Sequence, residues 1–277
     1  MARAGLKPPR MNMSNILDRI LKTKRQEVSA LKALTSADDE RRRAVDAPEA
    51  KDFFRAVGSE PRRLVNLIAE IKKASPSAGV IREDFDPPTI ASQYAAAGAD
   101  ALSVLTDEQY FQGSLDYLVQ ARAAVDIPLL RKDFIIDPIQ IHRGRAAGAD
   151  AILLIAAALA AGELGDLLGL ANDLGMTCLV EVHNADELDK VEAIVAGAPG
   201  NLLGVNNRDL TTFTVDLATT VNLLKRIGAG IPVVSESGIK TRNDVETVAA
   251  AGARAILVGE TLMRSGDMAA GVQGLVG

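Results

Sequence analysis

Three segments of the sequence repeat one short pattern, in which a helix end rich in small residues is followed by an apolar run. They read AAAGADALSVL at 95–105, RAAGADAILLI at 145–155 and AAAGARAILVG at 249–259. Their spacing is close to one and then two pairs of strand–helix units. Glycine near the helix end readily takes the left-handed conformation of a helix cap. A chain that repeats this pattern is expected to fold as an α/β protein.

The apolar runs are continuous, which is typical of strands buried on both faces of a parallel sheet. Eight strands are predicted, at about 64–72, 100–105, 127–133, 149–155, 176–182, 201–206, 231–236 and 254–259. Predicted helices separate them, including 88–97, 137–147, 163–174, 186–195, 217–227 and 243–251. Eight such units predict a (β/α)8 barrel. The rival doubly wound sheet is disfavoured because no Gly-x-Gly-x-x-Gly follows the first strand.

The segment before the first strand is predicted to be helical and to precede the repeating body. Residues 14 to about 34 carry apolar side chains at helical spacing. A second polar helix begins near Arg41 and is anchored by Phe53 and Phe54. The predicted organisation is a disordered tail at 1–13, an N-terminal helical extension at 14–63 and the barrel at 64–277.

Composition excludes several classes of function. The 277-residue chain has a net charge of −5, so it lacks the basic excess that binds nucleic-acid phosphates. No apolar run reaches the roughly 18 residues of a membrane span. The single Cys178 excludes an internal disulfide, and two histidines argue against a histidine-rich zinc site. We expect a cytoplasmic protein with no metal, no organic cofactor and a small-molecule substrate.

Polar and ionisable residues gather at the carboxyl ends of the predicted strands, where barrels of this kind build their active sites. Glu70 and Lys72 end the first strand and lie two residues apart, so they share one face. Other strand ends read Arg131-Lys132-Asp133-Phe134, Glu181-Val182-His183, Asn206-Asn207-Arg208-Asp209, Ser235-Glu236-Ser237-Gly238 and Gly259-Glu260. A stabilising ion pair would explain one such end. The convergence of six favours a catalytic site.

Two strand ends have the small residues that suit a phosphate. Ser237-Gly238 follows the seventh strand, and Gly259 ends the eighth just before a predicted helix. The loops after the last two strands often bind phosphate in this fold, and glycine permits a close approach. Two ordinary turns are the alternative interpretation. Three cations over the mouth, Lys72, Lys132 and Arg208, would balance a phosphate plus a carboxylate.

Six motifs at six strand ends resemble those of indole-3-glycerol phosphate synthase, a family of tryptophan biosynthesis. They are AEIKKASPSAG (69–79), LRKDFI (130–135), LVEVH (179–183), GVNNRDL (204–210), VSESGI (234–239) and LVGETLM (257–263). The resemblance implies a carboxy-lyase that converts 1-(2-carboxyphenylamino)-1-deoxy-D-ribulose 5-phosphate to indole-3-glycerol phosphate, CO2 and water. It implies no cofactor, and it implies association with other tryptophan-pathway enzymes.

The resemblance also implies roles for individual residues. Lys132 would be the general acid that protonates the ribulose carbonyl oxygen, and Glu181 the general base that completes aromatisation and dehydration. The implied catalytic residues are Lys132, Glu181, Lys72, Glu70, Asn206 and Ser237. The implied substrate-binding residues are Arg208, Phe134, Ser75 and Glu236. The implied phosphate-binding residues are Ser75, Ser237, Gly238, Gly259 and Glu260, the last through its backbone N–H because its side chain is anionic.

Some questions stay open at this point. Neighbouring cations lower the pKa of a lysine, so Lys72, Lys132 and Arg208 are expected to help one lysine act as an acid near neutral pH. Which lysine acts in which step is not determined, and His183 is explained equally well as a rim residue or a participant. A phosphosugar isomerase is an alternative, disfavoured because it would pair Cys with Asp or two Asp. A non-catalytic barrel is another, disfavoured by the intact Lys132 and Glu181.

Overall fold

The computed structural model describes residues 14–209, 212 and 214–277. The predicted disordered tail at residues 1–13 lies outside the described residues. The central strands are β1 (Asn66–Ile71), β4 (Ala101–Leu105), β5 (Leu129–Lys132), β6 (Ala151–Ile155), β7 (Thr177–Val182), β8 (Leu202–Asn206), β9 (Val233–Glu236) and β10 (Ala255–Val258). They are parallel, and the sheet closes because β1 pairs with both β10 and β4. The predicted (β/α)8 barrel is confirmed.

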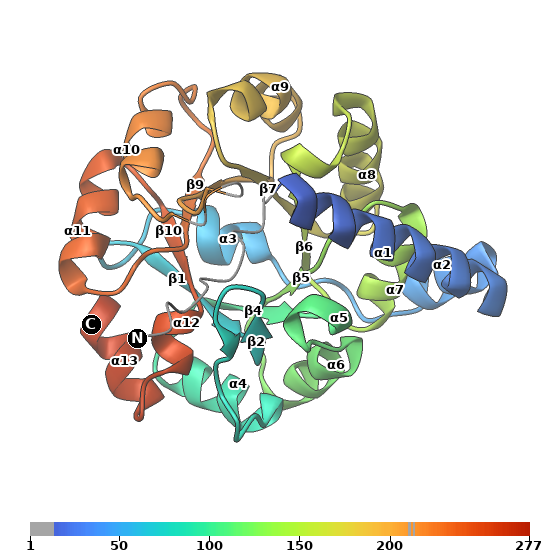
Figure 1. Ribbon diagram of the computed structural model, residues 1–277, viewed down its shortest axis with the longest axis horizontal. Helices are drawn as coiled ribbons and strands as arrows, with labels where there is room; N and C mark the ends of the chain where they lie inside the picture. The colour runs from blue at the N-terminus through green and yellow to red at the C-terminus, as the bar shows by residue number, and fades with distance from the viewer. Residues whose placement is uncertain (1–13, 210–211, 213) are drawn as a thin grey trace, which may run out of the picture.

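Helices surround this barrel, as Figure 1 shows. They are α4 (Pro87–Ala96), α5 (Glu108–Phe111), α6 (Leu115–Ala124), α7 (Pro138–Ala146), α8 (Ala161–Asp173), α9 (Ala185–Ala196), α10 (Ala218–Leu224), α11 (Arg242–Ala251), α12 (Glu260–Met263) and α13 (Met268–Val276), with the 3-10 turn η1 (Ala156–Ala158). The loop after β1 also forms β2 (Ala74–Ser75) and β3 (Gly79–Val80), a short antiparallel pair. Two-residue strands are too short to show an alternating pattern, so the sequence did not reveal them. None of the described helices has both the length and the apolar character that a membrane crossing requires.

Three helices precede the barrel, where the sequence analysis predicted two. They are α1 (Ser14–Leu34), α2 (Ala37–Val45) and α3 (Phe53–Gly58). The additional helix is α3, whose Phe53 and Val57 are fully buried with the side chains inside the barrel. Asn66, the first residue of β1, donates side-chain hydrogen bonds to the carbonyls of Val57 and Ser59. The helix α3 therefore closes the amino end of the barrel.

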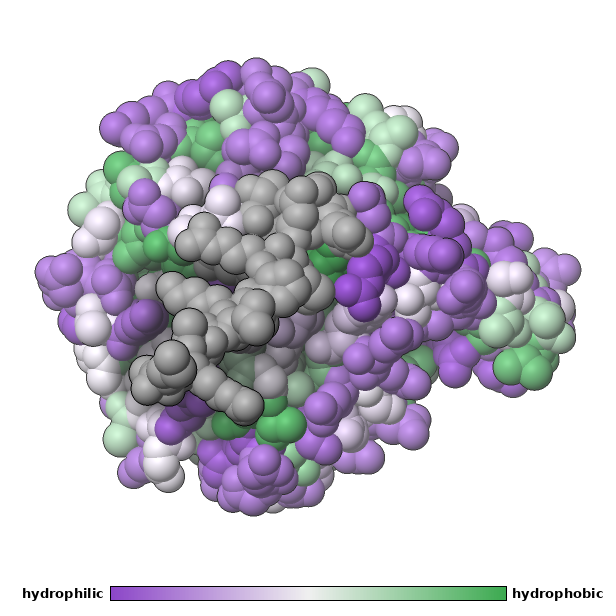
Figure 2. Space-filling view, viewed as in Figure 1, coloured by the Kyte–Doolittle hydropathy of each residue, from purple (hydrophilic) through white to green (hydrophobic). Residues whose placement is uncertain are grey.

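The rest of the extension reaches to one side of the barrel. In Figure 1, α1 and α2 project beyond the ring of helices, and α2 packs mainly against α7. Figure 2 shows this projection as a largely hydrophilic surface with an apolar tip, and the exposed apolar residues of that region are Leu34 and Val45.

Alternation along the strands sorts their side chains into two layers. One row packs inside the barrel, as Ile68, Leu130, Leu179 and Val234 do, and the other row packs against the helices. Each inward row continues toward the carboxyl end of its strand. The inward positions there are occupied by Glu70, Lys132, Glu181, Asn206 and Glu236. The fold thus directs four ionisable side chains and one amide, from five strands, to one end of the barrel.

The aspartates of the repeated Gly-Ala-Asp motif serve the opposite end. Asp150 accepts hydrogen bonds from the backbone N–H of Leu129 and from Arg122, both at 2.8 Å. Asp100 in the same way accepts from the backbone N–H of Leu67 at 2.7 Å. These aspartates fix the starts of neighbouring strands, so the role of the repeat is structural.

Candidate active site

A cavity of about 750 Å³ opens at the carboxyl ends of the strands. All the residues that the sequence analysis named for the site line it. They are Lys132, Glu181, Lys72, Glu70, Asn206, Ser237, Arg208, Phe134, Ser75, Glu236, Gly238, Gly259 and Glu260. The fold therefore brings them to one place, while the role of each stays a prediction.

The cavity also has walls that the sequence analysis missed. Ile16, Leu17 and Ile20 of α1 form an apolar side of it. Their helical spacing was visible in the sequence, but nothing local indicates which surface of the barrel the helix covers. Lys240 and Arg264 are further lining residues. The signals for these two were their positions, two residues after Gly238 and one helical turn after Glu260.

Lys132 lies between two carboxylates at the centre of the cavity. Its Nζ is 3.2 Å from Glu181 Oε2 and also donates a hydrogen bond to Glu236 Oε2. The three residues come from β5, β7 and β9, which alternate around the barrel. Glu181 and Glu236 are almost completely buried. Side chains this close in a site with little water interact strongly.

The expectation that neighbouring cations lower a lysine pKa is wrong for Lys132. Burial lowers its pKa, but the Glu236 and Glu181 carboxylates outweigh burial and raise the pKa above its ordinary value. Lys132 therefore stays protonated throughout the neutral range. The sequence shows which strand ends carry cations, but it does not show which charged side chains are in contact, so the direction of this pKa could not be predicted correctly.

The two carboxyl groups differ in protonation. Burial and the adjacent Glu181 raise the pKa of Glu236 to about 8, although Lys132 acts in the opposite direction. Burial would also raise the pKa of Glu181, but Lys132 and His183 lower it below its usual value. Two carboxyls this close cannot both ionise easily, so Glu236 keeps a proton near neutral pH while Glu181 is an anion.

The imidazole of His183 links Glu181 to a second carboxylate. Its Nε2 is 3.3 Å from Glu181 Oε1, and its Nδ1 is 2.9 Å from Glu187 Oε2 on α9. Burial opposes the charge on His183, but the Glu181 and Glu187 carboxylates beside its two ring nitrogens raise its pKa to about 10. His183 does not line the cavity, so it contacts the site only through Glu181.

This pKa predicts how His183 stabilises the fold at different pH. A histidine whose pKa rises from 6.5 to about 10 on folding stabilises fully below pH 6.5 and progressively less as the pH approaches 10. We therefore expect His183→Gln to lower the free energy of unfolding most at pH 6 and little at pH 10. Urea unfolding at pH 6, 8 and 10 measures this.

His142 is the matched control for this experiment. Burial and Arg41 lower its pKa, so its protonation favours the unfolded chain as the pH falls below 6.5. His142→Gln should therefore raise the free energy of unfolding most at low pH, which is the opposite trend to that of His183→Gln. An effect of His183→Gln that is constant or grows with pH would contradict the charged state assigned to His183.

Glu70 and Lys72 form a second ion pair in the cavity. Lys72 Nζ donates to Glu70 Oε2 at 2.5 Å, which confirms that the two side chains lie on one face of the strand end. Asn206 Oδ1 accepts a hydrogen bond from the backbone N–H of Arg208 at 3.0 Å. This bond fixes the amide and leads the chain from β8 into the loop that carries Arg208.

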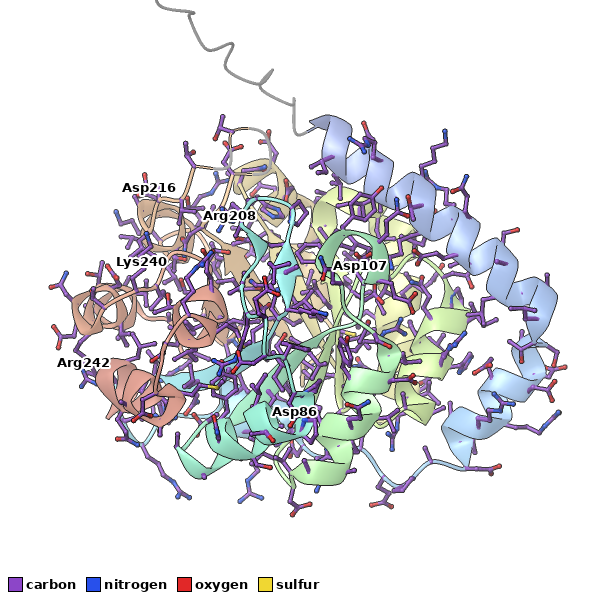
Figure 3. The ribbon with its side chains drawn as sticks, turned by 60° about the horizontal axis from the view of Figure 1, so that its bottom comes forward. Asp86, Asp107, Arg208, Asp216, Lys240 and Arg242 are labelled. Carbon is purple, nitrogen blue, oxygen red and sulfur yellow. The ribbon has the colours of Figure 1, made fainter. Side chains whose placement is uncertain are left out.

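The turn after β9 has the geometry expected of an anion cradle. Ser237 and Gly238 both have positive φ, at 65° and 83°. A positive φ is unfavourable for serine, and such strain concentrates at functional sites. Figure 3 shows Arg208 and Lys240 on neighbouring loops at this end of the barrel. Among the described residues, neither forms an ion pair with a carboxylate, so positive charge is left over beside the turn.

Glu260 lies on the same side of the cavity. Its Oε1 accepts from Arg264 Nε at 2.9 Å, one helical turn away. This pair neutralises the carboxylate that the sequence analysis noted as unsuited to direct phosphate contact.

Two glycines are required by the close approach of buried carboxylates. A Cβ at Gly204 would lie 2.2 Å from Glu236 Oε1, and a Cβ at Gly259 would lie 2.1 Å from Glu70 Oε2. The sequence analysis assigned Gly259 to phosphate, and the structure adds that this glycine makes room for Glu70. No signal in the sequence connected Gly204 with Glu236.

Gly204→Ala is expected to push the Glu236 carboxyl group away from Lys132. Misplacing a group by about 1 Å can lower turnover about 10²-fold, and overpacking a core costs about 1–3 kcal/mol of stability. Steady-state turnover and thermal unfolding measure the two effects. Gly169→Ala in α8 is the control, because nothing lies within 4 Å of the added Cβ. That control should keep full activity and gain stability from helix propensity.

No group of three or more His, Cys, Asp or Glu in the part of the chain described here could hold a metal ion. Cys178 is buried in β7, and burial raises the pKa of its thiol. A thiol of this kind is a packing group.

Comparisons with known proteins agree on one family. The family model described as indole-3-glycerol phosphate synthase matches residues 17–275. An indole-3-glycerol phosphate synthase of Neisseria gonorrhoeae is 51% identical over 261 residues, covering 94% of this chain and 98% of that protein. Proteins of the same description from Chromobacterium violaceum and Azospirillum brasilense are 51% and 49% identical, covering 92% and 95% of this chain and 95% and 100% of their own lengths.

Solved structures of more distant proteins share the fold. A 3-hexulose-6-phosphate synthase superposes with a TM-score of 0.61 at 15% identity, covering 76% of this chain and 98% of that chain. The 3-hexulose-6-phosphate synthase of Salmonella typhimurium gives 0.60 at 13% identity, covering 76% and 96%. At these identities the likeness extends to the barrel alone.

Proposed function

Since the chain belongs to the indole-3-glycerol phosphate synthase family, we propose that the cavity is its active site, with Lys132 as general acid and Glu181 as general base. The enzyme is a carboxy-lyase of tryptophan biosynthesis. It converts 1-(2-carboxyphenylamino)-1-deoxy-D-ribulose 5-phosphate to indole-3-glycerol phosphate, CO2 and water. The observation that carries the residue assignment is the 3.2 Å contact between Lys132 and Glu181 inside this cavity. Because the family is assigned, the two alternatives, a phosphosugar isomerase and a non-catalytic barrel, are no longer supported.

Ring closure needs a proton donor at the ribulose carbonyl. The ring carbon that bears the carboxylate attacks the carbonyl carbon, and negative charge develops on the carbonyl oxygen. Lys132 is held protonated by the negative charge of the adjacent Glu181–Glu236 pair. An alkoxide is a stronger base than a lysine amine, so a fully protonated Lys132 can still transfer its proton. General acid catalysis of this kind contributes about 10²–10⁴-fold.

The later steps need a base. Loss of CO2 returns an electron pair to the ring, and loss of the new hydroxyl as water then requires removal of a proton from the ring system. Glu181 is suited to this step because it is an anion at neutral pH and lies beside Lys132. His183 holds its second oxygen in place. Lys72, which Glu70 positions, binds the substrate carboxylate until it leaves as CO2.

The substrate spans the cavity from the aromatic side to the phosphate side. Phe134 follows β5, while Ser237, Gly238 and Gly259 follow β9 and β10, on the far side of the ring of strands. Phosphate bound at this turn, near Arg208, anchors the flexible ribulose chain over the ring. Holding reacting groups in this way is worth effective molarities of about 10⁵ M or more.

Three further proposals concern the N-terminal extension, the location of the enzyme and its partners. Residues 14–63 act as an extension that serves the catalytic barrel at 64–277. The enzyme works in the cytoplasm on a phosphorylated small-molecule substrate. It associates with other enzymes of the tryptophan pathway, which co-purification from cells would test.

The appearance of indole fluorescence tests the reaction directly. The chain has no tryptophan, so indole-3-glycerol phosphate is observed without a protein indole background. Incubation with the substrate at pH 6 to 9 should give the product. A protein that binds phosphate yet forms no product anywhere in this range would overturn the assignment.

A further inference from the structure

A buried lysine joins the N-terminal extension to the catalytic end of the barrel. Lys24 lies on α1 between Ile20 and Val28, at the four-residue spacing that defines one helix face. Its side chain is only 3% exposed. Lysine is rarely buried without a charged partner, so this position needs an explanation.

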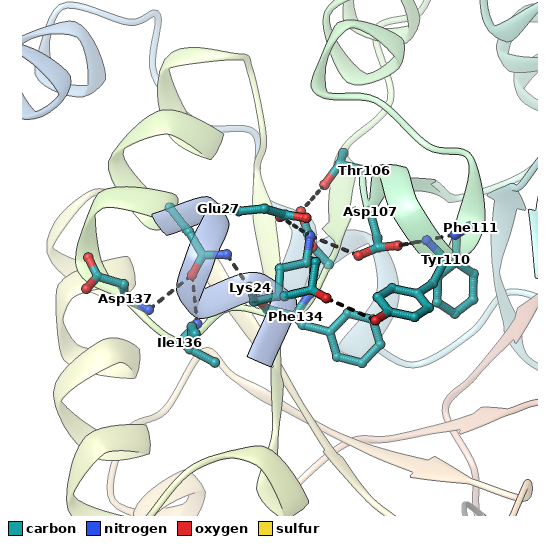
Figure 4. Close-up of polar contacts among 12 residues, drawn as sticks. Lys24, Glu27, Thr106, Asp107, Tyr110, Phe111, Phe134, Ile136 and Asp137 are labelled. Atoms are coloured by element: carbon teal, nitrogen blue, oxygen red, sulfur yellow. Dashed lines mark hydrogen bonds and ion pairs between the residues drawn. The ribbon is translucent and has the colours of Figure 1, made fainter. Parts of the chain in front are cut away.

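The ammonium group of Lys24 is surrounded by three carboxylates. Its Nζ is 2.9 Å from Asp107 Oδ2, 3.0 Å from Asp133 Oδ1 and 2.8 Å from Glu27 Oε2. Figure 4 shows Lys24 between Glu27 on its own helix and Asp107 on the barrel. Asp107 and Asp133 follow β4 and β5, so the lysine bridges two neighbouring strand ends.

Both barrel carboxylates are built into rigid structure. Asp107 Oδ1 accepts the backbone N–H groups of Tyr110 and Phe111 and so caps α5. Asp133 Oδ2 accepts from Arg131 at 2.8 Å and from Thr106 at 2.6 Å. These bonds leave Asp107 Oδ2 and Asp133 Oδ1 directed at Lys24. The acceptor geometry is therefore fixed by the barrel and not by the mobile end of a surface side chain.

Docking of the helix places apolar side chains over the aromatic end of the cavity. Ile16 and Ile20 pack together with Tyr110 and Phe134, and Thr23 Oγ1 is 3.0 Å from the Tyr110 hydroxyl. Phe134 in turn contacts Phe111, with ring centroids 6.1 Å apart. The α1 wall of the cavity exists only while the helix lies on this surface.

The charges make this docking specific. Burial disfavours the ammonium form of Lys24, but Asp133 and Asp107 outweigh burial and raise its pKa. If α1 left the barrel, Asp107, which is fully buried, would lose the cation that balances its charge. A second ion pair between α1 and the barrel, Lys32 with Asp137, is half exposed on the lysine side and contributes much less.

We propose that Lys24 is a positioning residue, which pins α1 to Asp107 and Asp133 so that Ile16 and Ile20 complete the aromatic end of the substrate site. The proposal rests on the active site assigned above. Lys24 itself does not line the cavity and touches no substrate. Its effect is transmitted through the position of α1 and through Asp133, which directly follows Lys132.

The test compares binding at the two ends of the site. Lys24→Met should weaken the affinity for indole-3-glycerol phosphate about tenfold or more, measured by the fluorescence of the bound indole, and should raise the substrate KM more than it lowers kcat. The inhibition constant of inorganic phosphate should stay within about twofold, because the turn after β9 lies across the barrel from α1. A general loss of structure would weaken both ligands.

A second variant removes the charge imbalance. The double variant Lys24→Met with Asp107→Asn leaves no buried anion unpaired and keeps the cap on α5 through the asparagine oxygen. It still lacks the contacts by which Lys24 holds α1 on the barrel. Asp107→Asn alone keeps the contact of Lys24 with Asp133 and should lie between wild type and the double variant. Lys22→Met, an exposed lysine on the same helix, is the control and should match wild type.

Hydrogen exchange of α1 supplies a direct readout. Amides of α1 should exchange at least tenfold faster in the double variant, while those of β5 and β7 stay protected. Retained indole affinity in the double variant, or loss of the whole barrel fold, would each overturn the proposal. The proposed function fails separately: it is rejected if Lys132→Ala keeps turnover, whatever happens at α1.

Discussion

Replacing Lys132 with alanine is expected to lower kcat about 10²–10⁴-fold, because no other group donates a proton to the ribulose oxygen from this position. The inhibition constant of inorganic phosphate should stay within about twofold of wild type. Phosphate binds at the turn after β9 under the proposal, and that turn does not contact Lys132. Steady-state fluorescence measures turnover, and competition with phosphate measures binding.

Two controls separate this effect from damage to the fold. Lys225→Ala removes an exposed lysine at the end of α10 and should leave turnover unchanged. Lys132→Arg keeps the charge between Glu181 and Glu236, so it should keep the stability that alanine loses while remaining a poor acid. If Lys132→Ala turned over at more than a tenth of the wild-type rate, Lys132 would not be the general acid.

Glu181→Gln is expected to lower kcat by a similar factor of about 10²–10⁴, because glutamine cannot accept a proton. The substitution preserves the size of the side chain and its contact with Lys132. Burial raises the pKa of Glu181, but Lys132 and His183 lower it below its usual value of 4.5. The carboxylate is thus ready as a base at any pH above about 5. Wild-type kcat should show no acid limb from this group between pH 6 and 9.

The control for the Glu181 substitution is the same substitution at an exposed glutamate. Glu246→Gln on α11 removes a charge far from the cavity and should leave kcat and its pH profile unchanged. A Glu181→Gln enzyme that lost activity only below pH 6 would contradict the role of base. The double variant of Lys132 and Glu181 should be hardly slower than either single variant, because the two residues act on one reaction path.

Much of the fold followed from local patterns. The continuous apolar runs and the Gly-Ala-Asp repeats predicted all eight strands to within a few residues, since burial of a parallel strand is recorded in its own residues. The helix α5 and the pair β2–β3 were not predicted, because each is four residues or fewer per element and too short to show a period, whereas α12 lies where a helix was predicted after Gly259. The helix α3 was seen only as an apolar anchor. Its role in closing the amino end of the barrel could not be predicted, because the local sequence does not indicate which surface the helix packs against.

The site followed from a similar rule with a clear limit. Parallel strands bring their carboxyl ends together, so Lys132, Glu181 and Glu70 could be assigned to one rim before any distance was known. The direction of the Lys132 pKa could not, because it depends on contacts with Glu181 and Glu236, 49 and 104 residues away in the chain. Coulomb energies change steeply over a few ångströms, and sequence spacing carries no such resolution.

By itself the sequence determined the barrel, its family and the side of the barrel at which chemistry occurs, because each of these is a periodic or ordered property of the chain. Only the tertiary structure decided which charges are neighbours, that Gly204 makes room for Glu236, and that Lys24 of α1 meets Asp107 and Asp133. These features depend on contacts between segments that are far apart in the chain. Their physical origin is the short range of packing and of electrostatics in a buried site, which acts only after the chain has closed.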